Sequence, residues 1–95
     1  MAKKWKALDK VQEEMCELGV ELAKLSAFPS GKHPGRKKSL IPSVEDECAD
    51  VLNAIEFFIE RNGLDLAKIL KRKEAKRRRF IKWWGDAKKA PKAKS

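Results

Sequence analysis

The spacing of its apolar residues is the feature that most restricts how this 95-residue chain can fold. From about Trp5 to Ser26, apolar side chains recur at steps of three and four, the period of an amphipathic helix. They are Leu8, Val11, Met15, Leu18, Leu22 and Leu25. This stretch is therefore predicted to form the first helix.

A second helix is predicted after a loop rich in Pro, Gly and Lys that runs from Phe28 to Pro42. Ser43 is its expected N-cap, because Asp46 stands three residues on, and Glu45, Asp46 and Glu47 suit the positive end of a helix dipole in the first turn. Gly63 is expected to end it. Its apolar set is Val44, Cys48, Val51, Leu52, Ile55, Phe58 and Ile59. Cys48, and Cys16 in the first helix, are expected to pack as small apolar side chains against the opposite helix.

A third helix is predicted to begin near Leu64 or Asp65 and to reach Trp84. Residues 1–84 would then form a single all-α domain, and the basic segment 85–95 a flexible tail. A chain this short buries only about 60% of its unfolded surface, and three such helices cannot enclose a bundle alone. We therefore expect a helical bundle that is completed when the chain forms a homodimer or homotetramer.

The formal net charge of +9 is unevenly distributed along the chain. From Lys68 onward there are thirteen Lys or Arg against two acids, a net charge of +11, which leaves −2 for the first 67 residues. Two cysteines, no zinc pattern and no secretory leader predict a cytoplasmic setting. The apolar run from Val51 to Ile59 is far shorter than the roughly 20 residues that span a bilayer, so no membrane contact is expected.

Two pairs of acids share the spacing i, i+3: Glu14 with Glu17, and Glu47 with Asp50. At about 100° per residue, both pairs lie to the same side of their helix's apolar stripe. If the stripes pack together, four carboxylates converge and repel one another unless a cation joins them. Ligands that are all carboxylate oxygens favour Mg²⁺, or Mn²⁺, over zinc. An acidic face in contact only with solvent is the competing interpretation.

The acids also match a known motif. The run Glu13-Glu14-Met15-Cys16-Glu17, with Glu47-Cys48-Ala49-Asp50, resembles the EExxE and ExxD pair of the MazG-like all-α nucleotide pyrophosphohydrolases, and the resemblance covers roughly residues 8–81. That family hydrolyses nucleoside triphosphates between the α and β phosphates, releasing the monophosphate and pyrophosphate. The resemblance implies that Mg²⁺ binds to Glu14, Glu17, Glu47 and Asp50. It makes Glu13 and Glu17 the catalytic candidates, with Glu13 and Glu21 as candidates for holding the attacking water.

The predicted phosphate ligands are basic: Lys73, Lys76 and Arg77 in the third helix and Lys38 in the loop. Lys73 and Arg77 are the preferred pair, because they share a helix face at i, i+4. Three interpretations of the third-helix cations stay open: a solvated or acid-neutralising face, a clamp on the triphosphate, and a contact with nucleic acid.

Two other functions compete with the nucleotide pyrophosphohydrolase. One is a small basic protein without enzymatic activity that binds nucleic acid or a protein partner through its C-terminal third. The other is a phosphoribosyl-ATP pyrophosphatase, which has a similar pair of acid-bearing helices and a different substrate.

Overall fold

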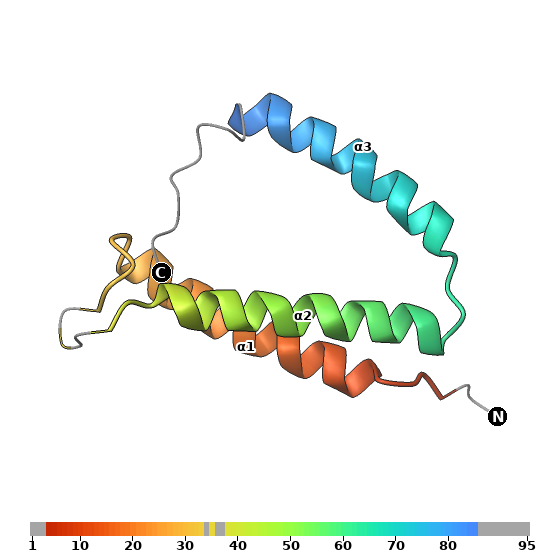
Figure 1. Cartoon of the computed structure of the whole chain (residues 1–95), viewed down its shortest axis with the longest axis horizontal. Helices are drawn as coiled ribbons and strands as arrows, with labels where there is room; N and C mark the ends of the chain where they lie inside the picture. Colours follow the sequence, from red (N-terminus) through yellow and green to blue (C-terminus); the bar gives the residue numbers. More distant parts are fainter. Residues whose placement is uncertain (1–3, 34, 36–37, 86–95) are drawn as a thin grey trace.

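The computed structural model describes residues 4–33, 35 and 38–85, most of which lie in three helices (Figure 1). Helix α1 spans Leu8–Ala27, α2 spans Ile41–Arg61 and α3 spans Leu66–Trp84. Among the described residues the β-type pairing consists of one isolated bridge, between Lys32 and Ser39. The prediction of an all-α fold is confirmed. Of the predicted tail, 85–95, all residues from 86 onward lie outside the described residues.

Helices α1 and α2 pack side by side and antiparallel, and we call this pair the hairpin (Figure 1). At its loop end, the N–H of Leu40 donates a 2.6 Å hydrogen bond to the carbonyl of Gly31. Gly31 has φ +80, and a Cβ there would lie 3.3 Å from the Ile41 side chain. Glycine is therefore required at this turn both by its backbone angle and by the close approach of α2.

Helix α2 begins at Ile41. The prediction that Ser43 is its N-cap is therefore wrong. The N-cap residue is Leu40, whose side chain makes no capping hydrogen bond. Pro42 stands in the first turn, where its missing N–H leaves no hydrogen bond unmade. The hydroxyl of Ser39 accepts a 3.0 Å hydrogen bond from the N–H of Ile41. Because the helix starts earlier, the three acids predicted for its first turn lie beyond that turn.

At the end of the hairpin opposite the loop, which we call the open end, the side chain of Asn62 joins the end of α2 to the segment before α1. Its Nδ2 donates to the carbonyl of Lys6 and its Oδ1 accepts from the N–H of Lys6, both at 2.9 Å. The same Nδ2 reaches the Phe58 carbonyl at 2.8 Å. The chain then turns at Ala7, which has φ 64, so α1 begins at Leu8, about three residues later than predicted.

The interior of the hairpin is small. Its buried apolar residues are Leu40, Ala54 and Ile59, and the buried charged residue is Glu14, which is 6% exposed. The buried residue of α1 is therefore one that carries a carboxylate. Such a group requires a partner or a pKa shift to be tolerated.

Helix α3 leaves the hairpin and extends away from it (Figure 1). Its start agrees with the prediction: the Asp65 carboxylate accepts a 3.0 Å hydrogen bond from the N–H of Lys68 and caps the helix. None of its residues is buried. The radius of gyration is 16.5 Å, whereas a compact chain of this length would have about 12 Å. The third helix therefore adds almost nothing to the core.

One side of the hairpin is apolar and exposed. Helix α1 exposes Leu8, Met15 and Leu22, and α2 exposes Leu52 and Ile55. At about 100° per residue, each set lies on one flank of its helix, and the antiparallel packing puts both flanks on the same side of the hairpin. We call this the apolar side.

The expectation that the cysteines pack between the helices is wrong. Cys16 and Cys48 are both exposed, because each lies off the line along which α1 and α2 touch. Within the described residues, no helix combines the length and the apolar character needed to cross a bilayer.

Candidate metal centre

Acidic side chains of both hairpin helices meet on the side opposite the apolar side. Carboxylate oxygens of Glu14, Glu47 and Asp50 all lie within 4.8 Å of one another, and so do those of Glu13, Glu14 and Glu17. Glu14 belongs to both groups and joins them. We call these five residues the carboxylate cluster. It includes the four predicted metal ligands, drawn from two helices as the matching i, i+3 spacings require.

Glu14 is the best enclosed member of the cluster. Its Oε1 lies 3.1 Å from Nζ of Lys10, while its Oε2 is buried and has no hydrogen-bond partner within the part of the chain that the structure describes. Glu47 likewise has a buried Oε2 without a partner. Two buried carboxylate oxygens from opposite helices therefore lack the partners that such atoms normally have.

The cluster also shifts the acidity of Glu47. Burial is the largest cause that raises the pKa of Glu47 above its ordinary value, and the negative charges of Glu17, Asp50, Glu14 and Glu21 raise it further. Four of the five contributions to this shift thus come from neighbouring carboxylates, three of them on α1. A cation bound among these groups would relieve their repulsion.

The residues present fit a hard divalent cation. Every donor atom in the cluster is a carboxylate oxygen, and Mg²⁺ and Mn²⁺ prefer such donors. The unpartnered oxygens of Glu14 and Glu47 are two ligand atoms, and Asp50 supplies a third within 4.8 Å. Asp50 is exposed, which leaves the site open to a ligand that itself brings oxygen atoms.

Lys10 is a member of the site that the sequence interpretation missed. Besides its contact with Glu14, its Nζ lies 3.5 Å from Oε1 of Glu13. The hydrogen bond with Glu14, followed by the charges of Glu13 and Glu14, raises the pKa of Lys10. A lysine three and four residues before two glutamates is a recognisable helix pairing, so the signal was present in the sequence.

A cleft of about 340 Å³ adjoins the cluster toward the open end of the hairpin, and we call it the first cleft. Two cluster members, Glu14 and Asp50, form part of its wall, together with Lys10, Asn53 and Phe57. Asn53 and Phe57 lie three and seven residues beyond Asp50, on the same flank of α2. Nothing in the acid motif pointed to them.

A second cleft, of about 380 Å³, lies toward the loop end. Its wall includes the charged residues Glu21, Lys24 and Lys38 and the hydroxyl residues Ser39 and Ser43. Nζ of Lys24 lies 3.1 Å from Oε2 of Glu21. Of the four predicted phosphate ligands, Lys38 is the one that lies in a cleft near the cluster.

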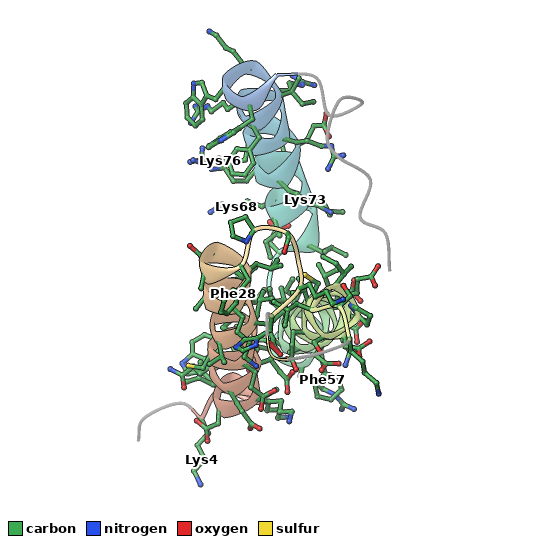
Figure 2. All side chains as sticks on the ribbon, turned by 90° about the vertical axis from the view of Figure 1, so that its left-hand side faces the viewer. Lys4, Phe28, Phe57, Lys68, Lys73 and Lys76 are labelled. Carbon is green, nitrogen blue, oxygen red and sulfur yellow. The ribbon has the colours of Figure 1, made fainter. Side chains whose placement is uncertain are left out.

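The other three, Lys73, Lys76 and Arg77, are exposed residues of α3. Figure 2 shows Lys73 and Lys76 above the hairpin and Phe57 on the hairpin's far side, pointing away from α3. Because Phe57 and Asp50 share the first cleft, the carboxylate cluster also opens away from α3. Within one chain, the structure does not bring these three cations to the acids, and their role as a clamp stays a prediction.

No protein-family model, curated protein or solved structure matches this chain. The chemistry of its site is therefore inferred from its own residues.

Proposed function

We propose that the protein is an Mg²⁺-dependent nucleoside triphosphate pyrophosphohydrolase, which cleaves its substrate between the α and β phosphates. The observation that favours this function most is the meeting of Glu14, Glu47 and Asp50, with two buried oxygens that find no hydrogen-bond partner among residues 4–33, 35 and 38–85. A solvated acidic face does not bury its carboxylates, so this geometry counts against the competing interpretation.

In this proposal Glu14, Glu17, Glu47 and Asp50 hold the cation, and Lys10 fixes Oε1 of Glu14 so that Oε2 is directed at the site. When bound, Mg²⁺ neutralises phosphate oxygens and makes a water molecule more acidic. A water molecule held beside the carboxylates would bond through its oxygen to one phosphorus as the bond from that phosphorus to the bridging oxygen breaks. The bridging oxygen would leave with the other product, and one proton of the water would pass to a carboxylate of the cluster. Glu13 is paired with Lys10, so Glu17 is the preferred proton acceptor.

The resemblance of the same acids to the MazG-like motif also supports this proposal. A phosphoribosyl-ATP pyrophosphatase would use the same cluster on a different substrate. The test is pyrophosphate release from a panel of ribo- and deoxyribonucleoside triphosphates and phosphoribosyl-ATP, with Mg²⁺, with Mn²⁺ and with a chelator. We expect turnover that requires the cation. Lack of release from every substrate at saturating Mg²⁺ would rule the function out.

A second copy of the chain is the proposed partner of the apolar side. Five large apolar residues are exposed there although they belong to the two best-packed helices. Two hairpins that face each other through these sides would form a four-helix bundle. Their carboxylate clusters would then lie on the outside of the bundle, accessible to substrate.

Binding of nucleic acid is the second candidate function, and it rests on helix α3. Between Leu66 and Trp84 there are nine Lys or Arg and one acid. All of these charges are exposed, and the ion pair shown within the helix joins Arg78 to Glu74 at 3.6 Å. An exposed cationic helix of this kind suits a phosphate backbone. Binding to duplex and single-stranded DNA at several salt concentrations tests it, because each phosphate contact adds to the salt dependence.

A further inference from the structure

The two clefts and the carboxylate cluster form one line along the hairpin. On α2, Asn53 lies about one turn after Asp50, and Ser43 lies about one turn before Glu47. All four residues lie on the same flank of the helix. A ligand with its middle at the carboxylates therefore extends into the first cleft at one end and into the second cleft at the other.

The two ends differ in charge. Among the described residues that line the first cleft, the cation is Lys10, which is outnumbered by Glu14 and Asp50 and already contacts Glu14 at 3.1 Å. The Arg61 guanidinium near this end lies over the Phe57 ring. In the second cleft, two lysines stand against one carboxylate. There, Lys24 is paired with Glu21, while Lys38 has no ion-pair partner among the described residues. The second cleft is thus the end that attracts an anion.

The two ends also differ in the groups that could contact a base. The Phe57 ring is 43% exposed, and the Arg61 guanidinium carbon lies 4.8 Å from the centroid of the ring. Beside it, the Asn53 side chain has an amide with two donor hydrogens and an acceptor oxygen. The described wall of the second cleft contains no aromatic residue.

We propose that the two clefts and the carboxylate cluster between them, which we together call the groove, bind the nucleotide in one direction. The nucleoside lies in the first cleft against Phe57 and Asn53. The terminal phosphates lie in the second cleft near Lys24 and Lys38. This inference rests on the proposed function, because it places the bond to be cleaved over the carboxylate cluster. It adds that Asn53 and Phe57 determine base preference, since an amide discriminates among base edges and a ring stacks on any base.

The test measures the two product halves separately. Binding of each of the four common nucleoside 5′-monophosphates, and of inorganic pyrophosphate, is titrated calorimetrically in the presence of Mg²⁺. We expect Asn53→Ala to weaken monophosphate binding about fivefold, most for the preferred base, and to leave pyrophosphate binding unchanged. Lys38→Ala should weaken pyrophosphate binding about fivefold and leave monophosphate binding unchanged.

Matched controls separate these effects from general changes in charge or fold. Lys32→Ala removes an exposed lysine from the same loop as Lys38, and Glu56→Gln changes an exposed residue of α2 outside the groove. Both controls should bind the two ligands as the unmodified chain does. Circular dichroism should show the same helix content in all variants.

The outcomes are distinct. Effects that are exchanged between the two variants would show that the nucleotide lies in the opposite direction, and equal effects or none would also overturn the inference. Turnover of triphosphates by the unmodified chain reports on the proposed function by itself. If the unmodified chain shows no turnover but the expected binding pattern is seen, the proposed hydrolase function is refuted and the proposed direction of binding stands. If turnover is seen without that pattern, only the proposed direction of binding is refuted.

Discussion

Nζ of Lys10 lies 3.1 Å from Oε1 of Glu14, so the most deeply buried carboxylate among the described residues has one oxygen held by a cation and the other without a hydrogen-bond partner from those residues. The lysine side chain is 59% exposed and the glutamate side chain 8%. The lysine thus makes the burial of Glu14 tolerable, while Oε2 stays available to a metal ion.

This relationship predicts the behaviour of two substitutions together. Lys10→Met should lower the melting temperature of the metal-free protein, because Glu14 is then left charged and buried without its partner. The loss should be much smaller when Glu14 is already Gln. Thermal melts of the four proteins in a chelator form a double-mutant cycle. If Lys10→Met is equally harmful in both backgrounds, the pairing is not what stabilises Glu14.

The proposed metal ligands can be tested directly. Glu14→Gln and Asp50→Asn should each abolish pyrophosphate release and weaken Mn²⁺ binding, measured by electron paramagnetic resonance, while the helical circular dichroism spectrum is nearly unchanged. Each substitution removes one anionic ligand and keeps the shape of the side chain. Glu60→Gln, at an exposed position near the end of α2, is the control. Turnover within twofold of the unmodified protein in both variants would refute the metal assignment.

The raised pKa of Glu47 predicts a dependence of stability on pH. In the metal-free protein, folded Glu47 holds its proton at pH values where the unfolded chain, near the ordinary value of 4.5, has lost it. Its contribution to stability therefore falls as pH rises through the folded pKa. The surrounding charges are Glu14, Glu17 and Glu21 of α1 and Asp50 of α2.

Glu47→Gln should consequently raise the melting temperature of the metal-free protein at pH 7 and leave it little changed at pH values near that ordinary pKa. Melts between these two pH values in a chelator give the difference between the two proteins. A difference that does not grow with pH would show that Glu47 is not destabilised by its neighbours.

The position of α3 predicts that any triphosphate clamp acts between chains. Figure 2 shows Phe57 on the side of the hairpin that faces away from α3, and Phe57 lines the first cleft together with Glu14 and Asp50 of the carboxylate cluster. The Lys73→Ala, Arg77→Ala double variant should therefore lose about tenfold or more in kcat/KM, and Glu14→Gln should be inactive. Mixing the two in equal amounts, after joint refolding, should restore about a quarter of the activity, since one site in each mixed dimer is intact.

No recovery on mixing would refute a clamp between chains, and full activity of the double variant would remove the clamp altogether. The same double variant should weaken DNA binding and lower its salt dependence by about two counterions if α3 binds nucleic acid.

The apolar side predicts self-association. Sedimentation at micromolar concentration should show a dimer or larger species, because exposed apolar patches of this kind mark interaction sites. Leu52→Lys, which places a charge at a position 61% exposed in one chain, should shift the protein toward monomer. The matched control is Asp46→Lys, at an exposed position of the same helix about 120° around its axis from Leu52. A well-folded monomer of the unmodified chain would contradict the bundle.

Much of this architecture is visible in the sequence, for physical reasons. The helix period places Glu14 and Glu47 on corresponding flanks, and Asp65 is a strong N-cap, so the acid cluster and the start of α3 follow from local rules. The start of α2 does not, because Pro42 in the first turn and the Ser39 hydroxyl replace the expected cap at Ser43.

The clefts and the placement of α3 are beyond local rules. Asn53 and Phe57 acquire their role from the helix opposite them, and periodicity along one helix carries no information about that neighbour. Helix α3 makes few contacts with the hairpin, so its direction depends on the short segment around Gly63, which has φ 62, rather than on its own apolar pattern.

The hydrogen bonds at the two ends of the hairpin have a consequence for how such a protein can diversify. Asn62 fastens the open end to Lys6, and Leu40 fastens the loop end to Gly31. These hydrogen bonds fix the alignment of α1 with α2 at both ends of the hairpin. The alignment therefore depends less on the residues between the two ends. Substitutions along the groove can therefore change the ligand that it binds, while the hydrogen bonds that align the helices, and with them the position of Glu14 opposite Glu47, stay unchanged.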